Sequence, residues 1–184
     1  LNFVKKSQIR KKFLKLRESK LKKIKLINHN NIIKLLKKKG IKGKIVGGYY
    51  PYNNELDCIQ ILEKLEKKNY IISLPRIKKN FQMDFIQWNF KEPLVINKFG
   101  IPEPSNGKIK FPDLLLIPLL SFDKKLNRVG YGGGFYDRYI HRIKRKKKPL
   151  LIGLAYSFQR VKSIPFNRYD KKLDFVVTEK KIVE

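Results

Sequence analysis

The sequence predicts an α/β fold, a single-domain three-layer sandwich with a mostly parallel central sheet and helices on both faces. Apolar runs typical of buried strands alternate with helical patterns, the order that parallel strands and their helical crossovers require. The 184 residues are close to the length of one domain, and no linker or repeat divides them, so 1–184 is expected to form one unit. A hydrophobic content of 42% is enough to bury a core.

The amino-terminal part is predicted to form two helices, a strand and a third helix. Apolar side chains keep helical spacing over 3–24, and Gly40 would end a second helix over 26–39. The segment KIVGGYYPY, at 44–52, is typical of a strand that leads into a turn. A third helix is expected over 55–68, with a regular apolar stripe.

The rest of the chain is predicted to supply most of the sheet. Strands are expected over 70–77, 83–90, 113–122, 150–158 and 173–180. The run DLLLIPLLSF is continuously apolar, which indicates a strand buried on both faces. Several Pro and Gly residues favour a long loop over 91–112, and a glycine-rich turn is expected to lead into a helix before the next strand.

The composition excludes several kinds of site. A single cysteine, Cys58, excludes an intrachain disulfide framework and a multi-cysteine zinc site. The two histidines, His29 and His141, lie far apart, so a histidine-centred triad has little support. No run reaches about 18 apolar residues and the start lacks the pattern of a secretory signal, so we expect a cytoplasmic protein with no membrane partner.

The charge has two interpretations. Lys and Arg number 44 against 15 Asp and Glu, a net charge of +29, which suits a polyanionic partner such as nucleic acid. Alternatively, a lysine-biased composition coats every solvated face. The lysines are spread over the whole chain rather than gathered in one motif, so we expect at most non-specific binding of nucleic acid, and a monomer.

The segment RVGYGGGFYDR, at 128–138, carries the strongest chemical signal. Four of the 11 glycines fall within its five residues 130–134. Glycine lets backbone N–H groups turn toward a phosphate, and the N-terminus of the following helix adds positive charge. A buried strand is expected to lead into this loop, so that it would lie at a strand's carboxyl end, where open α/β sheets bind ligands. The alternative is a tight turn without a ligand; the segment matches neither a Walker A motif nor a dinucleotide fingerprint.

Charged residues near this loop suggest a phosphate and a cation. Arg128 precedes the loop and could hold a phosphate with its planar guanidinium. Asp137 lies in the first helical turn, where a carboxylate beside a phosphate is unfavourable unless a cation such as Mg²⁺ lies between them. Asp170 and Asp174 offer further carboxylates. Two alternatives to a metal site remain open: Asp137 could instead interact favourably with the helix dipole, and Asp174 could pair with lysines.

Two further segments could complete a site. Lys6 and Arg10 are one helical turn apart, and Arg17 lies on nearly the same face, so the first helix could present cations to one oxyanion; a solvated face is the alternative. In YYPYNNELD, at 49–57, the aromatic residues could form a stacking wall, and Glu55 could point into the same cleft or merely cap a helix.

Taken in order along the chain, these segments resemble the 5-formyltetrahydrofolate cyclo-ligase family. The resemblance runs nearly from end to end, and Phe135, where many members have Tyr, loses only a hydroxyl. The residues and motifs that carry it are Lys6 with Arg10, YYPYNNELD, YIISLPRI, MDFIQW, GIPEP, DLLLIPLLSFD, RVGYGGGFYDR, GLAYSFQ and IPFNRYDKKLDFVVTE.

The resemblance also implies a set of site residues. For ATP they are Lys6, Arg10, Arg128, Gly130, Tyr131, Gly132, Gly133, Gly134, Phe135 and Tyr136; for the folate they are Arg10, Tyr50, Glu55, Tyr131 and Phe135; for Mg²⁺ they are Asp137 and Asp170. Arg128 and Tyr136 are the expected catalytic residues. This assignment requires Asp170 to lie beside 130–137 in the folded chain.

The resemblance implies a carbon–nitrogen ligase reaction. ATP phosphorylates the formyl oxygen of 5-formyltetrahydrofolate, N10 attacks the formyl carbon, and 5,10-methenyltetrahydrofolate, ADP and phosphate are released. No protein nucleophile is required, which suits a chain with one Cys and two separated His. A protein with the same fold and ATP site but another substrate is the alternative.

Overall fold

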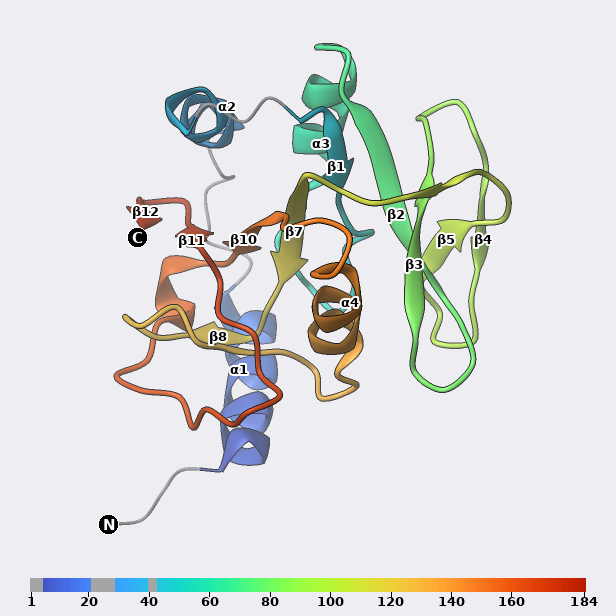
Figure 1. Cartoon of the computed structure of the whole chain (residues 1–184). Coiled ribbons are helices and arrows are strands. Elements are labelled where there is room, and N and C mark those ends of the chain that lie inside the picture. Colours follow the sequence, from blue (N-terminus) through green and yellow to red (C-terminus); the bar gives the residue numbers. More distant parts are fainter. Residues whose placement is uncertain (1–4, 21–28, 40–42) are drawn as a thin grey trace.

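The computed structural model describes residues 5–20, 29–39 and 43–184, and is built around one eight-stranded sheet (Figure 1). The strand order is β12-β11-β10-β7-β1-β2-β3-β6. The strands are β1 (Ile45–Gly47), β2 (Ile71–Ile77), β3 (Met83–Gln87), β6 (Ile109–Lys110), β7 (Leu114–Pro118), β10 (Leu150–Leu154), β11 (Phe175–Val177) and β12 (Ile182–Val183).

The centre of the sheet is parallel and its edges are antiparallel. Strands β1, β2, β7, β10 and β11 run in parallel. At one edge β3 pairs antiparallel with β2 and β6 pairs antiparallel with β3, and at the other edge β12 pairs antiparallel with β11. Leu114 to Ile117 of β7 are all buried, because this central strand is covered on both faces. The predicted α/β class with a mostly parallel sheet is confirmed.

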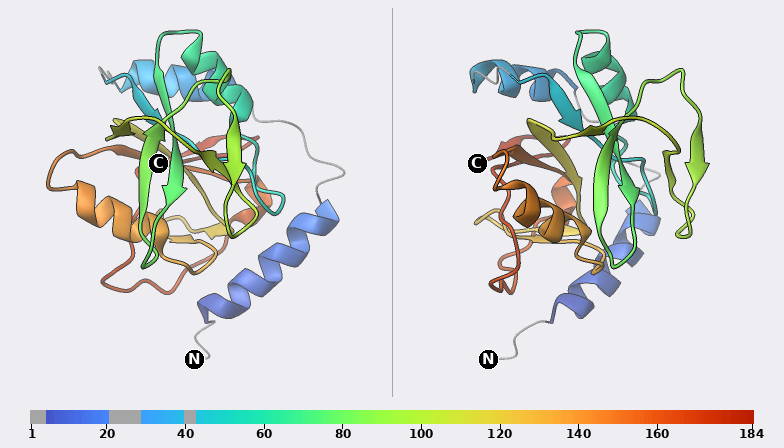
Figure 2. Two further views of the ribbon diagram at one scale, coloured as in Figure 1. Left: turned by 90° about the vertical axis from the view of Figure 1, so that its right-hand side faces the viewer. Right: turned by 45° about the vertical axis from the view of Figure 1, so that its right-hand side comes forward.

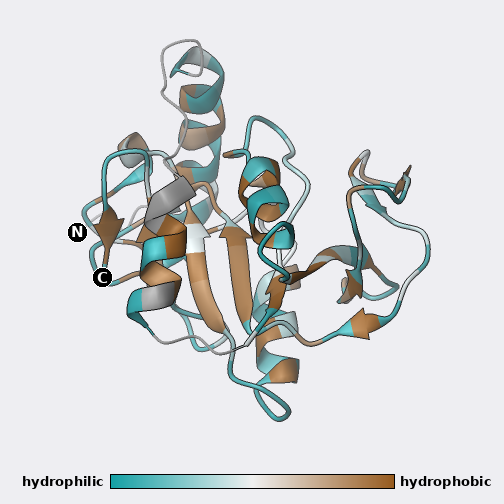
Figure 3. Ribbon diagram, turned by 90° about the horizontal axis from the view of Figure 1, so that it is seen from above, coloured by the Kyte–Doolittle hydropathy of each residue, from teal (hydrophilic) through white to brown (hydrophobic). Residues whose placement is uncertain are grey.

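Helices cover both faces of this sheet. Leu114 and Leu116 of β7 share a buried cluster with α2 (His29–Lys38) and α3 (Ile59–Glu66). Leu115 and Ile117 point to the other face, where they cluster with the buried side of α4 (Phe135–Ile143). Figure 3 shows the brown central strands between helices that carry teal residues on their outer sides. After β10, the chain forms a short 3₁₀ helix, η2 (Ser157–Gln159).

The first helix, α1 (Lys6–Lys20), lies below the sheet rather than on either face (Figure 2). Ile9 and Phe13 pack against Leu120, Val129 and Ile164 in a third buried cluster. Leu120 directly precedes β8 (Ser121–Phe122) and Val129 belongs to β9 (Arg128–Val129), the two strands of a small antiparallel sheet.

Several predicted boundaries fall outside the part of the chain that the structure describes. Residues 3–4 and 21–24 of the first predicted helix, 26–28 of the second and its proposed end at Gly40 are among them. Of the helices that the structure does describe, none combines the length and the apolar character needed to cross a membrane.

The prediction of a long loop over 91–112 is wrong. Within this segment β4 (Leu94–Ile96) and β5 (Pro102–Pro104) form an antiparallel ribbon, and β6 joins the main sheet. The prolines in this segment are typical of loops. In a two-stranded ribbon, however, each strand has one free edge, and a proline whose missing N–H faces that edge removes no hydrogen bond between the strands.

The predicted strand over 113–122 is also shorter than expected. It ends at Pro118, and after Leu119 and Leu120 the chain enters β8 (Ser121–Phe122), which pairs with β9 (Arg128–Val129). The strand that leads directly into the glycine loop is therefore a two-residue strand outside the parallel sheet. The helix expected over 55–68 begins only at Ile59. The Ile59 N–H donates a hydrogen bond to the Asp57 carboxylate at 2.7 Å.

Candidate active site

One pocket of about 1100 Å³ lies at the carboxyl ends of β1, β2 and β7. Its walls come from α1, the segment after β1, the β2–β3 turn, the glycine loop and the segment 167–171. All of the site residues that the family resemblance implies line it, whereas Arg17 and Asp174 do not. The site residues are Lys6, Arg10, Tyr50, Glu55, Arg128, Gly130, Tyr131, Gly132, Gly133, Gly134, Phe135, Tyr136, Asp137 and Asp170. Asp170 thus lies beside the glycine loop, as the assignment requires.

The glycine loop is packed closely against α1. The Arg10 Nε donates a hydrogen bond to the Gly130 carbonyl at 2.9 Å. Gly132 has a φ of 109°, and a Cβ there would lie 3.2 Å from the Arg10 guanidinium carbon. Gly134, the N-cap of α4, has a φ of 67°. A side chain at either position would have a disfavoured backbone conformation and would come too close to an arginine, Arg10 at Gly132 and Arg138 at Gly134. Glycine at these positions therefore allows the close packing of the loop.

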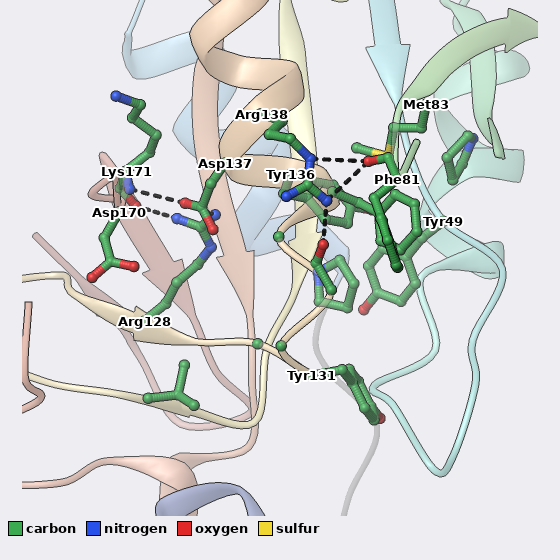
Figure 4. Close-up of a pocket in the computed structure, with 18 of the residues that line it drawn as sticks. Tyr49, Phe81, Met83, Arg128, Tyr131, Tyr136, Asp137, Arg138, Asp170 and Lys171 are labelled. Atoms are coloured by element: carbon green, nitrogen blue, oxygen red, sulfur yellow. Dashed lines mark hydrogen bonds and ion pairs between the residues drawn. The ribbon is translucent and has the colours of Figure 1, made fainter. Parts of the chain in front are cut away.

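Two ion pairs form the charged end of the pocket, and Figure 4 shows one of them, Arg128 with Asp137. Arg128 donates to the Asp137 Oδ1 at 2.7 Å, and the same oxygen accepts the Lys171 N–H at 2.9 Å. Lys6 forms an ion pair with Asp170, whose Oδ2 also accepts the Asn167 N–H at 2.8 Å. Two of the three cations expected to meet phosphate, Lys6 and Arg128, are therefore paired, in the free protein, with the carboxylates expected to meet a metal.

The carboxylates can accommodate Mg²⁺ that arrives with a phosphate ligand. In the described ranges no group of three or more His, Cys, Asp and Glu side chains could hold a metal ion. The second oxygens of Asp137 and Asp170 accept no hydrogen bond from the described residues. Because Mg²⁺ typically uses one or two carboxylates with substrate phosphates and waters, two carboxylates with one spare oxygen each fit it.

Aromatic side chains and one buried acid form the other end. Tyr50 is partly exposed, whereas Glu55 is buried and its Oε2 accepts the Tyr52 N–H at 3.0 Å. Burial raises the pKa of Glu55 to about 7, although the Tyr52 N–H and the Arg17 guanidinium oppose the rise. The Tyr136 hydroxyl is buried and has no hydrogen-bond partner among the described residues, which leaves it available to a ligand.

The raised pKa of Glu55 predicts a pH dependence of stability. Because the folded state holds this proton more tightly, its stabilising effect is complete below the ordinary pKa of 4.5 and is lost as the pH rises through about 7. Glu55→Gln should remove that dependence. Urea unfolding should show the wild type losing roughly 2–3 kcal/mol relative to the variant between about pH 5 and about pH 8. A constant difference across that range would contradict the raised pKa.

Arg17 is a site-supporting residue that sequence reasoning placed wrongly. It was expected beside Lys6 and Arg10 on a cation-bearing face, but it is only 1% exposed. Its guanidinium donates to the Tyr131 hydroxyl at 2.7 Å, to the Asn53 carbonyl at 3.3 Å and to the Leu119 carbonyl. The spacing in the sequence could have predicted that Arg17 is buried, because it follows Ile9 and Phe13 at four-residue steps along the buried stripe of α1.

Asp174, the carboxylate whose role was left open, does not line the pocket. Its Oδ2 accepts the Leu151 N–H at 2.8 Å, so it ties the start of β11 to β10.

Comparison with known proteins agrees with this geometry. The model of the 5-formyltetrahydrofolate cyclo-ligase family matches residues 2–179. The 5-formyltetrahydrofolate cyclo-ligase of Haemophilus influenzae is 33% identical over 140 residues, covering 72% of this chain and 74% of the relative. That of Escherichia coli is 31% identical over 147 residues, covering 76% and 80%.

Solved structures give the same result. The NMR structure of Aquifex aeolicus 5,10-methenyltetrahydrofolate synthetase superposes with a TM-score of 0.76 at 29% identity, over 96% of this chain and 91% of that one. A match that spans nearly the whole sequence and the whole fold leads to one conclusion: the chain belongs to the 5-formyltetrahydrofolate cyclo-ligase family.

Proposed function

We propose that this protein converts 5-formyltetrahydrofolate to 5,10-methenyltetrahydrofolate with ATP and Mg²⁺, releasing ADP and phosphate. Family membership supports the substrate and product. The observation that carries the ATP and Mg²⁺ requirement is that Lys6–Asp170, Arg128–Asp137 and the glycine loop all line one pocket with an aromatic, acid-bearing end.

The chemistry asks for activation of an amide rather than for a protein nucleophile. The formyl group on N5 is an amide, so its oxygen is a poor leaving group until it is phosphorylated. The neighbouring N10 then attacks the formyl carbon, the ring closes and phosphate departs. Cys58 could not serve as a nucleophile, since it is fully buried, its thiol donates to the Tyr49 carbonyl, and burial raises its pKa far above the ordinary value.

The charged end would hold the phosphates. Lys6, Arg10 and Arg128 offset the negative charge of the triphosphate, while the backbone of Gly132–Gly134 cradles the transferred group. Asp137 and Asp170 would hold Mg²⁺, which when bound neutralises charge on the phosphate oxygens. Phosphate would thereby replace each carboxylate as the partner of Lys6 and Arg128.

The aromatic end would hold the folate. Tyr50, Tyr131 and Phe135 offer rings to pack on planar parts of the substrate. Glu55, with a pKa of about 7, can accept hydrogen bonds from the substrate's N–H groups when ionised, or orient N10. The Tyr136 hydroxyl keeps its proton, because burial raises its pKa well above 10, and it can donate to a ligand oxygen at the meeting point of the two ends.

A direct assay tests the proposal. The purified protein mixed with 5-formyltetrahydrofolate, ATP and Mg²⁺ should produce the absorbance of the methenyl product with one ADP for each product formed. Omission of ATP, or chelation of the metal, should stop the reaction. Product formation without ADP release, or ADP release without product, would reject this function.

A further inference from the structure

Phe81 occupies a backbone position that phenylalanine rarely adopts. It lies at the tip of the turn between β2 and β3, where the Gln82 N–H donates to the Lys79 carbonyl at 3.3 Å. Both central residues have positive φ, 57° at Asn80 and 54° at Phe81. This is the pattern of a type I′ turn, in which Asn followed by Gly is strongly preferred. Asn80 fits the preference, whereas Phe81 stands where glycine would be relaxed.

The packing of the fold does not account for this side chain. Phe81 is 60% exposed, and its side chain belongs to none of the three buried clusters of the described residues. A large apolar ring that the core does not use, at a position that disfavours it, suggests a role outside folding.

The ring lines the active-site pocket together with two other phenylalanines. Its centroid lies 6.0 Å from that of Phe135, at the start of α4, and the ring centroid of Phe99, between β4 and β5, lies 6.1 Å from that of Phe135. Three segments distant in sequence therefore bring rings to one part of the pocket. Figure 4 shows Phe81 and Met83 on the opposite side of the glycine loop from Arg128, Asp137 and Asp170.

Arg138 fixes the turn against the glycine loop. Its guanidinium donates two hydrogen bonds to the Phe81 carbonyl, at 3.1 and 2.9 Å, and another to the Gly133 carbonyl (Figure 4). A Cβ on Gly134 would lie 2.7 Å from this guanidinium, so the glycine there leaves room for it. The backbone of Phe81 is consequently held in place before any ligand arrives, and the Arg138 guanidinium also lies 5.7 Å from the centroid of the Phe81 ring.

We propose that Phe81 is a specificity-determining residue that packs on a planar ring of the folate, retained in the turn at a cost in stability. The proposal rests on the proposed function and deepens it. Adenine also offers a planar ring, but the charges that would bind the triphosphate lie beyond the glycine loop, which favours the folate as the occupant of this end.

Phe81→Asn and Phe81→Gly test the proposal, because both residues suit the turn and neither supplies a ring. The KM for 5-formyltetrahydrofolate should rise roughly 3- to 10-fold, the range expected for one lost aromatic contact. The KM for ATP should stay unchanged, and kcat should change less than about 2-fold. The melting temperature should equal or exceed that of the wild type, a result opposite to that of an ordinary structural residue.

Two controls accompany these variants. Phe81→Trp keeps a ring and should keep the wild-type KM. Phe166→Asn removes another exposed phenylalanine, which lines a different pocket, and should leave both KM values unchanged.

Other outcomes would overturn the proposal. A rise in the KM for ATP alone would place adenine at Phe81, and an unchanged folate KM would remove the residue from the site. A fall in melting temperature with unchanged KM would make the role structural. If the wild type makes no methenyl product, the proposed function fails separately, and equilibrium dialysis with 5-formyltetrahydrofolate still compares wild type with Phe81→Asn; equal binding would overturn the role of Phe81.

Discussion

Replacing Asp137 by Asn should lower turnover of 5-formyltetrahydrofolate by roughly 10²- to 10³-fold or more while the protein stays folded. The carboxylate would hold Mg²⁺, and loss of a metal contact in phosphoryl transfer costs several kcal/mol in the transition state. Asn is preferred to Ala because the side chain of Arg128 is only 5% exposed. An amide oxygen can still accept from Arg128 and from the Lys171 N–H, whereas Ala would leave a buried guanidinium without its partner.

The rate of methenyl formation, measured over a range of Mg²⁺ concentrations, checks this expectation. The variant should need more Mg²⁺ for half-maximal rate, and its urea unfolding midpoint should stay near the wild-type value. Asp174→Asn is the matched control, since that carboxylate lies outside the pocket and bonds the Leu151 N–H. Wild-type turnover with unchanged Mg²⁺ dependence in Asp137→Asn would refute the metal assignment.

The parallel centre of the sheet could be predicted because its signals are local. Leu114–Ile117 is an uninterrupted apolar run, which is typical of a strand covered on both faces. The β4–β5 ribbon could not be predicted in this way. Its pairing places Leu94 opposite Pro104, so it depends on contacts within a segment whose composition is typical of a loop. Short strands of two or three residues are too brief for periodicity to reveal.

The candidate site shows a similar division. The motif residues are contiguous or one helical turn apart, so their types and spacing mark them in the sequence. The pairing of Lys6 with Asp170 joins the two ends of the chain, and only the folded structure brings these residues together. The strain at Phe81 is likewise invisible in the sequence, since neither Asn80 nor Phe81 reveals that both residues adopt positive φ.

The loss of Arg17 should reduce stability and alter the site as a consequence. Arg17→Met should lower the free energy of unfolding by roughly 2–4 kcal/mol, because the hydrogen bonds that the buried, charged guanidinium donates are lost. The Leu119 carbonyl keeps the Gln159 side chain as a partner at 2.8 Å, so the cost falls mainly on the Asn53 carbonyl and the Tyr131 hydroxyl. Urea unfolding measures the effect, and Lys15→Met on the exposed side of α1 should change stability by less than about 0.5 kcal/mol.

The same variant should alter the site through two routes. Without Arg17, Tyr131 loses its hydrogen bond to α1, so the glycine loop is held less firmly and the KM for ATP and folate should both rise. The positive charge that lowers the pKa of Glu55 is also lost, so that pKa should move above about 7 and the pH dependence of stability should shift upward with it. Tyr131→Phe separates the routes, because it removes the hydrogen bond and leaves the charge. If Arg17→Met and Tyr131→Phe give the same Glu55 titration, the guanidinium acts only as a donor, and its electrostatic role in the pocket is refuted.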